Sequence, residues 1–553
     1  MLEKSILNIL ENPKKKTIIF AAMIGLFLFS IATFPLEIVK AKMLPGKDSN
    51  TFSLYVDLPT GSAIKDTREV TACIANILQK EEIVLSTSVF LGQGQPLDFA
   101  GMVKGSSLKF EQNQAEMMVN IKKAEERDEK SFKFIQRVRP IVQSTCSLHH
   151  ANIKFVELPS GPPTLADVVV EVYGGKSSDS RRFFAQKIAD ILKAQKTLVD
   201  IDTLEDEPTK TFELVLNNNK VIESGIGMQQ IKRMIYIAIE GSDVGIINDA
   251  NAQNQIPIFV RIGGDSRLLL RGDKESIQAQ TQKLKLMNPS GLAIPLSYFV
   301  DVVEKDTIPA IRSKNLKKTT TVFATTDMES QIYPLLDARK MMLEVLSDQY
   351  DITKTNLLNL HFEDKKTKES FDIVWDGELK VTIDTFIDLG VAFIGALVLI
   401  FLLMVVYYHS YALSAAIVLS SFLSIIGVIW GHSVMDLLTA DRFYLTATSL
   451  IGFIGLIGIN SRNSLLIIDF AKELMKRENY SANKAIAVAT ATRAKPILLT
   501  VLAIVFASTL LSRDAVFGGL GVALIGGTLF AYLVSIYFVP LTIQNSLKAL
   551  EEK

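Results

Sequence analysis

The sequence has few of the residues that metal and redox sites use: it contains two cysteines and five histidines in 553 residues. Cys73 and Cys146 form no CxxC motif and flank no histidine at metal-ligand spacing, which argues against zinc and redox chemistry. No cofactor or metal is therefore expected. Spacing alone leaves open whether the two cysteines pair. Independent thiols are the favoured expectation, because a disulfide requires that both face an oxidising compartment.

Excess charge and catalytic motifs are lacking as well. The formal net charge is zero, from 59 basic and 59 acidic residues. No Lys/Arg-rich run with interleaved aromatics occurs, so nucleic acid is not an expected partner. The motifs GxSxG, HExxH and GxxxxGK[ST] are absent, and no nucleophile–base set assembles from the sequence. We therefore expect no enzymatic activity.

Apolar residues, in contrast, are abundant. They make up 48% of the chain, and the mean hydropathy is +0.26. These values are typical of a membrane protein with a large polar part. An α-helix needs about 20 apolar residues to cross a bilayer. Six stretches meet this length, at residues 17–36, 389–408, 411–430, 443–468, 496–512 and 516–540.

Basic residues predict the orientation of these spans. Lysines 14–16 precede the first apolar stretch, which is too long for a signal peptide and is expected to remain as an anchor. Residues 472–495 form a second basic segment. The positive-inside rule places both segments in the cytoplasm. The N-terminal segment 1–16 and the tail 541–553 are then cytoplasmic, and residues 37 to about 385 lie on the other side of the membrane.

The polar region after the first span alternates strand and helix patterns. Strands are predicted at 51–59, 115–122 and 152–158, and helices at 63–78 and 129–144. Two successive β-α-β patterns of this kind suit a ferredoxin-like unit. The segment PSGPPT (159–164) then interrupts both kinds of element, because its prolines and glycine continue neither.

A second α/β unit is predicted after this break. It starts with the strand DVVVEVYG, a helix at 179–196 and the strand TFELVLN, and it is completed by TTTVFATT, a helix at 333–348 and a strand near 368–375. Between its halves lies an insert at about 216–306, with a helix at 227–239 and the strands IPIFVRI and LAIPLSYFV. Inserted modules often serve recognition.

One charged residue interrupts the apolar sequence of the span 443–468, in SLIGFIGLIGINSRNSLLII: it is Arg462. A cation at mid-bilayer costs about 2.5 to 3.5 kcal/mol on insertion scales, so it is expected to face a bundle interior and to pair there. The alternative is that Arg462 lies near the cytoplasmic end and snorkels to the interface. Six uncharged residues before Asp469 favour the buried pair.

Small and polar residues accompany Arg462. Asp469 follows two helical turns later, on the same predicted face. Asn460, Ser461 and Asn463 are expected to add hydrogen-bonding groups around the guanidinium, and Thr500 brings a hydroxyl into the next span. Glycines at every third residue predict the close approach of a neighbouring helix: these are Gly452, Gly455 and Gly458.

A guanidinium does not deprotonate in proteins, so Arg462 is predicted to act as a fixed counter-charge and not as a proton carrier. A proton relay also needs a titrating carboxylate or histidine near mid-membrane. Asp469 lies toward the cytoplasmic end of its span, and the other acidic residues near spans lie at the outer boundary. The titrating group is therefore expected from another polypeptide.

The segments around these residues resemble a known family. GINSRNSLLIIDFAKEL, TRAKPILLT and RDAVFGGLGVALIGGTLFAYLVSIYFVPL resemble the C-terminal half of resistance-nodulation-division (RND) efflux permeases, hydrophobe/amphiphile branch, of the multidrug, acriflavine-resistance type. The likeness extends to VKAKMLPGKDSNTFSLYVDLPTGS, ELPSGPPTLADVVVEVYG and VWDGELKVT, and so covers nearly the whole chain.

The resemblance implies a polytopic α-helical membrane protein. Its six transmembrane helices are arranged one before and five after a large α+β periplasmic domain, with the last five within 386–540. That domain consists of ferredoxin-like porter subdomains and an inserted docking subdomain. By position, residues 37–158 correspond to porter subdomain 1, 159–215 with 307–385 to porter subdomain 2, and 216–306 to the docking subdomain.

The resemblance also implies a function. Such permeases are secondary transporters that work as trimers in the inner membrane of Gram-negative bacteria. Proton antiport drives export of drugs and other amphiphiles through a periplasmic adaptor and an outer-membrane channel. Arg462 matches the family's basic residue in this span, and Arg493 and Thr500 match further positions linked to proton coupling. The expected proton-coupling residues are Arg462, Asn463, Asp469, Arg493 and Thr500.

The sequence departs from the family in lacking the N-terminal repeat. We expect a split permease whose other half is a separate chain that supplies the mid-membrane aspartates. The alternatives are an inactive truncated permease, half of a heavy-metal exporter, and an accessory subunit of protein translocation. Membrane lipid and small amphiphilic substrates complete the list of expected partners.

Overall fold

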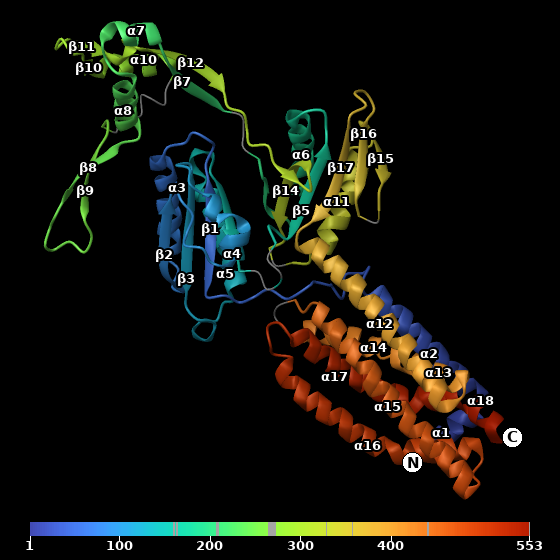
Figure 1. The fold of residues 1–553 in the computed structure, drawn as a ribbon. Coiled ribbons are helices and arrows are strands. Elements are labelled where there is room, and N and C mark those ends of the chain that lie inside the picture. Colours follow the sequence, from blue (N-terminus) through green and yellow to red (C-terminus); the bar gives the residue numbers. More distant parts are fainter. Residues whose placement is uncertain are drawn as a thin grey trace. The chain divides into compact units, whose positions relative to one another are not determined.

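The computed structural model describes residues 1–158, 161, 164–205, 209–263, 273–327, 329–356, 358–439 and 442–551. The chain forms two compact units, which are described separately (Figure 1). The first unit is Met1–Glu205 with Ile311–Lys553, and the second is Asp206–Ala310. Most of the predicted break PSGPPT lies outside the described residues, as do the last two residues of the predicted tail.

Among the described residues, six helical segments of the first unit are long and apolar enough to cross a membrane. The first is α2 (Pro13–Ala32), the second α12 (Glu378–Tyr408), and the third is divided into α13 (Tyr411–Phe422) and α14 (Ile425–Leu438). They are followed by α15 (Ala447–Glu478), by α16 (Ala482–Leu511), and by α17 (Gly518–Leu533) continued as α18 (Val539–Glu551).

Two of these helices begin well before the apolar stretches from which they were predicted. α12 starts at Glu378 and α16 at Ala482, because the residues before each apolar stretch, mixed polar and apolar in α12 and rich in alanine in α16, continue the helix. Pro496, at the start of the apolar stretch 496–512, therefore lies in the interior of α16 and not in its first turn.

The short amphipathic helix α1 (Leu2–Glu11) packs against this bundle. Its buried residues Ile6 and Leu10 join the core formed with α16 and α18. The buried side chain of Gln544 closes the contact: its amide donates to the carbonyl of Leu10 at 2.9 Å and to Asn483 Oδ1 at 2.7 Å. The two ends of the chain therefore meet at one end of the bundle.

Subdomain 1 is a four-stranded antiparallel sheet in the order β2-β3-β1-β4. Its helices α3 and α5 pack on the face that carries Phe52, Leu54 and Val56. The other face carries Tyr55 and Glu116, which are buried and hydrogen-bonded to Ser106. The strands are β1 (Thr51–Asp57), β2 (Val84–Leu91), β3 (Gln114–Ile121) and β4 (Asn152–Val156), and the helices are α3 (Ile64–Leu78), α4 (Phe99–Lys104) and α5 (Ser131–Cys146).

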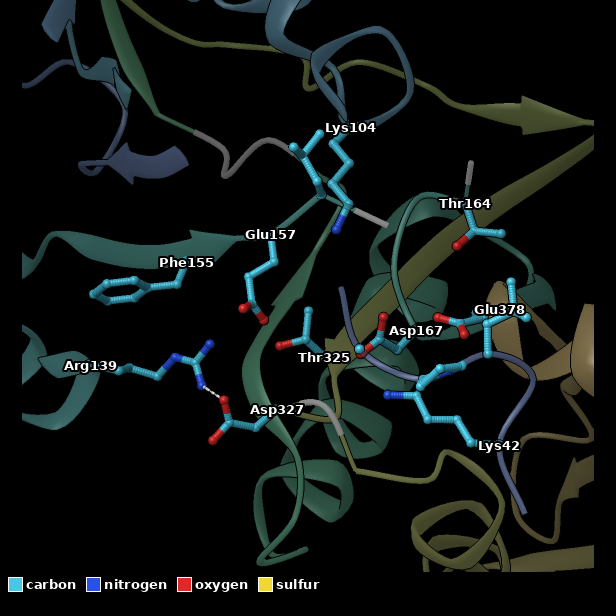
Figure 2. Close-up of a pocket in the computed structure, with 14 residues that line it drawn as sticks. Lys42, Lys104, Arg139, Phe155, Glu157, Thr164, Asp167, Thr325, Asp327 and Glu378 are labelled. Carbon is cyan, nitrogen blue, oxygen red and sulfur yellow. Dashed lines mark hydrogen bonds and ion pairs between the residues drawn. The ribbon is translucent and has the colours of Figure 1, made fainter. Parts of the chain in front are cut away.

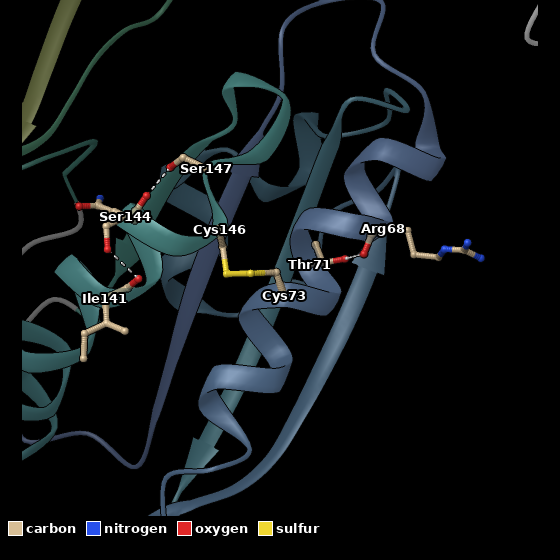
Figure 3. The surroundings of a disulfide bond; sticks show 8 residues. Arg68, Thr71, Cys73, Ile141, Ser144, Cys146 and Ser147 are labelled. Atoms are coloured by element: carbon tan, nitrogen blue, oxygen red, sulfur yellow. Dashed lines mark hydrogen bonds between the residues drawn. A yellow bond between two sulfur atoms is a disulfide. The ribbon is translucent and has the colours of Figure 1, made fainter.

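The two cysteines pair, contrary to the favoured expectation of independent thiols. A disulfide joins Cys73 on α3 to Cys146 at the end of α5, with 5.7 Å between the Cα atoms (Figure 3). Separation in the sequence hid the pairing, because the two helices become neighbours only when both pack on the same face of the sheet.

Subdomain 2 is a seven-stranded sheet in the order β13-β14-β5-β17-β16-β15, with β6 also paired to β14. Helices α6 and α11 pack on the face that carries Val168, Val170 and Val172. The strands are β5 (Val168–Gly174), β6 (Val199–Thr203), β13 (Ser313–Lys314), β14 (Lys317–Thr325), β15 (Tyr350–Lys354), β16 (Leu360–Asp364) and β17 (Ser370–Asp376), and the helices are α6 (Ser178–Lys193) and α11 (Ile332–Val345).

The second unit is held together by strands from its two ends. β7 (Lys210–Leu216) and β12 (Val300–Asp306) pair antiparallel over seven residues each. The predicted strand TFELVLN thus belongs to the inserted unit and not to the sheet of subdomain 2. The other elements are α7 (Asn218–Ser224), α8 (Met228–Ile239), β8 (Ser242–Ile247), β9 (Ile256–Val260), α10 (Lys274–Lys283), β10 (Lys285–Met287) and β11 (Ala293–Pro295).

The disulfide should stabilise subdomain 1. Replacing both cysteines, in Cys73→Ser/Cys146→Ser, is expected to lower the unfolding free energy by about 2 to 4 kcal/mol, since the bond closes a long loop. Thermal unfolding of the purified chain, with and without a thiol reductant, measures this. Ser144→Ala, an exposed change on the same helix, is the control. Equal unfolding temperatures for wild type and double variant would contradict the assignment.

Candidate functional site

Arg462 lies on an exposed stripe of α15. The side chains along this stripe are spaced three or four residues apart, so they share one helix face. Arg462 makes no hydrogen bond or ion pair with any residue that the structure describes. The members of the stripe are Ile451, Gly455, Gly458, Arg462 and Leu466.

The three glycines of this helix have different surroundings. A Cβ atom on Gly452 would lie 2.8 Å from Leu520 and 3.1 Å from Ala523, so this glycine lets α17 pack closely. Gly455 and Gly458 have no such neighbour within 4 Å among the described residues. Of these three glycines, Gly452 alone packs closely against another helix, and the other two leave an open face beside Arg462.

The polar residues next to Arg462 point away from it. Asn460 and Asn463 are each only 2% exposed, and Ser461 bonds to Ser421 of α13 at 3.2 Å. They lie on the buried side of α15, whereas Arg462 is exposed. The expectation that they surround the guanidinium is wrong, because residues adjacent in a helix project about 100° apart.

Asp469 is engaged elsewhere. Its carboxylate accepts a hydrogen bond of 2.8 Å from the hydroxyl of Tyr408 and one of 3.4 Å from Tyr407, both at the end of α12. Lys472 lies over the Tyr408 ring, with its Nζ 4.6 Å from the ring centre. Asp469 thus ties α12 to α15, and it is not the counter-charge of Arg462.

The two predicted residues of α16 make local contacts. The hydroxyl of Thr500 donates to the carbonyl of Pro496 at 3.1 Å. The guanidinium of Arg493 lies 4.8 Å from the ring centre of Phe470, and its buried Nε has no hydrogen-bond partner among the described residues. The structure therefore does not join Arg462, Asp469, Arg493 and Thr500 into one network within this chain.

A buried imidazole in the bundle was not singled out from the sequence. His432 of α14 is fully buried, and its ring nitrogens lie 2.8 Å from the carbonyl of Val428 and 2.8 Å from the hydroxyl of Ser449. His432 therefore joins α14 to the first turn of α15.

A second candidate site is a cavity of about 60 Å³ where subdomains 1 and 2 meet (Figure 2). It is lined by charged side chains of both signs, which come from α4, α5, the start of α12, and the segments before β1, after β4, before β5 and after β14. The charged lining residues are Lys42, Lys104, Arg139, Glu157, Asp167, Asp327 and Glu378.

Glu157 is the distinctive group of this cavity. One of its carboxylate oxygens is buried and has no hydrogen-bond partner among the described residues. Burial raises the pKa of Glu157 to about 8, and the nearby carboxylates of Asp327 and Asp167 act in the same direction, while Arg139 and Lys42 oppose it. The side chain therefore exchanges a proton near neutral pH.

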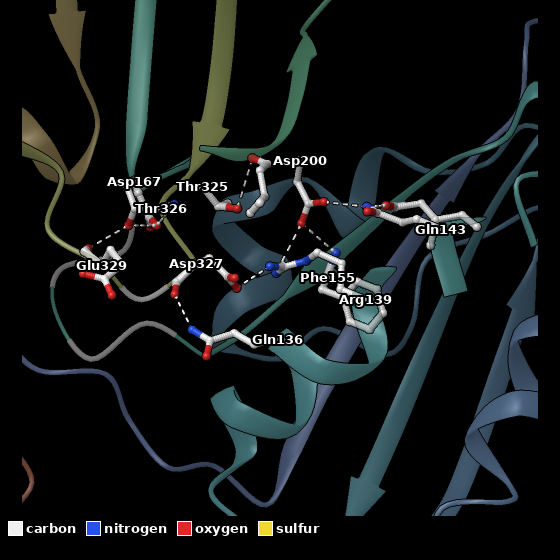
Figure 4. A network of polar contacts seen from close by, with 12 residues as sticks. Gln136, Arg139, Gln143, Phe155, Asp167, Asp200, Thr325, Thr326, Asp327 and Glu329 are labelled. Atoms are coloured by element: carbon white, nitrogen blue, oxygen red, sulfur yellow. Dashed lines mark hydrogen bonds and ion pairs between the residues drawn. The ribbon is translucent and has the colours of Figure 1, made fainter. Parts of the chain in front are cut away.

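Arg139 holds the two subdomains together beside this cavity (Figure 4). Arg139 belongs to α5, and its guanidinium forms an ion pair with Asp327 in the turn after β14. The same guanidinium lies 3.5 Å from the carboxylate of Asp200 on β6. Asp200 also accepts hydrogen bonds from Gln143 at 3.0 Å and from the backbone N–H of Phe155 at 3.1 Å. These contacts hold the two subdomains together on one side of the cavity, and we refer to the space between the subdomains as the cleft.

Sequence reasoning missed this cluster. Its members are isolated charged residues from segments far apart in the chain, and no fixed spacing relates them. The one available signal was position: Glu157 stands at the start of the segment ELPSGPPT, where the two α/β units were predicted to join.

Arg462 is thus an exposed cation on one of the long apolar helices, and a cation at mid-bilayer is costly unless it is paired. Residues 2–543 match the AcrB/AcrD/AcrF family. The chain belongs to this family of RND efflux transporters.

Similar proteins include the toluene efflux pump membrane transporter TtgB of Pseudomonas putida, 23% identical over 98% of this chain and 47% of that protein. The multidrug export protein AcrF of Escherichia coli is 22% identical over 95% of this chain and 46% of that protein. A crystal structure of a heavy metal efflux pump superimposes with a TM-score of 0.70 at 18% identity, over 100% of this chain and 52% of that one. The chain thus spans about half the length of these relatives.

Glu157 should make stability depend on pH. Its pKa is raised from an ordinary 4.5 to about 8 in the folded chain. Between these values the folded state keeps a proton that the unfolded state has lost, so the stability from this group falls as pH rises through that window. Glu157→Gln removes the penalty and should stabilise the chain at pH 8.5, by roughly 1 to 3 kcal/mol, with little effect near pH 4.5.

Thermal unfolding of wild type and variant across this pH range tests the expectation. Glu125→Gln, at an exposed glutamate of subdomain 1, is the matched control and should leave the pH profile unchanged. A Glu157→Gln profile parallel to that of the wild type would show that the carboxyl of Glu157 titrates normally.

Proposed function

We propose that this chain is the C-terminal half of a proton-driven RND efflux transporter that exports amphiphilic compounds. Export runs from the periplasm or inner membrane toward an outer-membrane channel. The observation that carries the proposal is Arg462, a permanent cation on an exposed apolar stripe of α15. Such a charge needs a carboxylate partner that this chain does not offer among its described residues.

The shape of the stripe suits a partner helix. Gly455 and Gly458 lie one turn apart and leave their face open, so a second helix can approach α15 closely beside the guanidinium. A mid-membrane aspartate on that helix would neutralise Arg462. We assign it to an N-terminal permease half.

In this arrangement Arg462 is the constant member of an ion pair. When the partner carboxylate takes up a proton the attraction disappears, and when it releases the proton the attraction returns. Each proton transferred thus changes the preferred position of α15 against the partner helix. We include four further residues of α15 and α16 in the proposed proton-coupling set: Asn463, Asp469, Arg493 and Thr500. Of these, Asp469 holds α12 against α15 through its hydrogen bond with Tyr408.

The remaining architecture supports the same assignment. Subdomain 1 and subdomain 2 are proposed as ferredoxin-like porter subdomains in the periplasm, and the disulfide suits that oxidising compartment. The unit Asp206–Ala310 is proposed as the docking subdomain. An inserted unit of this size favours efflux over an accessory role in protein translocation. We further propose a trimer in the inner membrane that works with a periplasmic adaptor.

Amphiphilic substrates are favoured over metal ions by one observation. Large apolar side chains are exposed on the α4 side of subdomain 1, and apolar, adaptable surfaces bind amphiphiles. Met117, in contrast, is fully buried in the core of subdomain 1, where it fills space. The exposed residues are Leu97, Phe99, Met102 and Phe110.

Arg462→Ala is expected to abolish proton-coupled export. Leaving a buried carboxylate of the partner unpaired costs about 3 to 5 kcal/mol, which corresponds to a loss of export of about 100-fold or more. Export of a fluorescent amphiphile is measured in proteoliposomes that hold the chain with its partner half and a pH gradient. Arg462→Lys keeps the charge and should retain part of the activity. Undiminished export by Arg462→Ala would refute the assigned role.

The open face of α15 should be the surface that binds the partner half. Gly458→Leu adds a side chain to open space, so the isolated chain should fold normally while co-purification of the partner half is lost. Gly25→Leu, at a glycine of α2 that also has open surroundings, is the matched control. Co-purification that survives Gly458→Leu would place the partner elsewhere, and mass spectrometry of the complex shows whether that half is a separate polypeptide.

A further inference from the structure

The turn that follows β14 contacts both subdomains and the segment before α15. It comprises residues 326–327 and 329–330 of the described chain. We refer to it as the coupling turn. Thr326 ties it to subdomain 2, since its backbone N–H and hydroxyl donate to the carboxylate of Asp167 at 2.8 and 2.9 Å (Figure 4).

The coupling turn also holds subdomain 1. The carboxylate of Asp327 pairs with Arg139 of α5, and the backbone carbonyl of Asp327 accepts a hydrogen bond of 2.8 Å from Gln136. Asp327 has a left-handed backbone with φ of 49°. That conformation is uncommon for a residue other than glycine and persists where surrounding contacts hold it. The contacts on both of its sides therefore set the shape of the turn.

The third contact of the coupling turn reaches the helix that carries Arg462. Glu329 accepts a hydrogen bond of 2.8 Å from the hydroxyl of Tyr444, which is 8% exposed and lies three residues before α15. Burial and the carboxylate of Glu329 raise the pKa of Tyr444, so its hydroxyl stays protonated and donates. Thr326 braces Glu329 in turn, because its hydroxyl lies 3.0 Å from the carbonyl of Glu329.

The start of α15 is also tied to the segment that leads into subdomain 1. Leu445 donates through its backbone N–H to the carbonyl of Lys40 at 2.9 Å and accepts from Lys42 N–H at 3.1 Å. Ser330 of the coupling turn donates to the carbonyl of Ala41 at 2.6 Å. The residues before α15, the segment 40–43 and the coupling turn thus form one hydrogen-bonded joint.

We propose that this joint transmits movement of α15 to the cleft between the two subdomains, and that the Tyr444–Glu329 hydrogen bond is its principal side-chain link. The proposal rests on the proposed function in one respect: the movement of α15 is the one driven at Arg462. Fifteen residues separate Ala447 from Arg462, about 22 Å along a rigid helix axis. A displacement at Arg462 is therefore carried along the helix to Ala447, three residues after Tyr444.

The consequence for the cleft follows from the position of Asp327. Any shift of Glu329 with Tyr444 reaches Asp327 through its neighbour Thr326, whose hydroxyl contacts the carbonyl of Glu329, and Asp327 holds Arg139. Arg139 in turn lies beside Asp200, on the side of the cleft formed by β6. Tyr444 and Glu329 are positioning residues in this account, since neither contacts substrate or the proton site.

Distance measurements between spin labels test the joint. Cysteines introduced at Ile141 of α5 and Leu336 of α11, both exposed, report the separation of the two subdomains. The full chain is reconstituted with its partner half, and the distance distribution is recorded at pH 7.5 and pH 5.5. In the background with wild-type Tyr444 we expect the distribution to shift on acidification. In Tyr444→Phe the shift should fall to less than a third, with an unchanged unfolding temperature.

The controls separate linkage from stability. Tyr173→Phe removes a similar tyrosine–glutamate bond, to Glu171 at 2.7 Å within subdomain 2, and should keep the full shift. Glu329→Gln retains an acceptor for Tyr444 and should keep most of it, whereas Glu329→Ala should behave as Tyr444→Phe does. The double variant Tyr444→Phe/Glu329→Ala should lose no more than either single variant, as expected for one shared bond.

Export measured on the same samples distinguishes the two proposals. We expect Tyr444→Phe to lower export about tenfold while proton uptake continues, because the cleft no longer follows α15. If wild type moves its cleft but exports nothing, the proposed function fails and the joint stands. A full shift in Tyr444→Phe, or no shift in wild type, overturns the joint.

Discussion

A guanidinium cannot shed its charge, and a charge cannot stay uncompensated in hydrocarbon. On α15 this constraint governs the organisation of the whole chain. The polar side chains beside Arg462 face the inside of the bundle, where Ser461 is hydrogen-bonded to Ser421. The nearest acid along the helix, Asp469, is held by Tyr408. The cation therefore has no partner among the described residues, and it lies on an exposed face of α15.

Charged side chains are also held close together between the two subdomains. Between the two subdomains, acids and bases meet in a cavity too small to solvate them fully, and Glu157 responds by holding its proton. Arg139 is paired twice over, with Asp327 and with Asp200. A cleft lined by such pairs is strong when closed and loses little when water enters, because each charge regains its hydration. That balance suits a contact that opens and closes repeatedly.

Long apolar runs made the membrane helices predictable, since length and hydropathy are local properties of the sequence. Their ends were not, because the mixed polar and apolar residues that begin α12 and the alanine-rich residues that begin α16 also continue the helix. The strands β1, β3 and β4 were predicted from alternation, while β2 and β6 were missed. Strand β6 is half-buried along its whole length and shows no clear alternation of burial.

Tertiary contacts account for the remaining errors. The Cys73–Cys146 bond depends on two helices sharing one face of a sheet. Which side of α15 is buried depends on α13 and α17, so Asn463 was placed near Arg462 when it lies on the inner side. The sequence was sufficient to name the candidate residues on α15. It was not sufficient to predict which of their side chains face the bundle and which are exposed. Glu157, Arg139 and Asp327 share no local pattern that would have revealed them.

The pairing of β7 with β12 brings the two ends of the second unit together. Asp306 lies opposite Lys210 in the ribbon, and the backbone N–H of Thr307 donates to the carbonyl of Thr209 at 2.7 Å. Described residues near the two ends of the unit are thus adjacent. The rest of the unit can change in length or sequence without changing the separation of the two chain segments that enter and leave it.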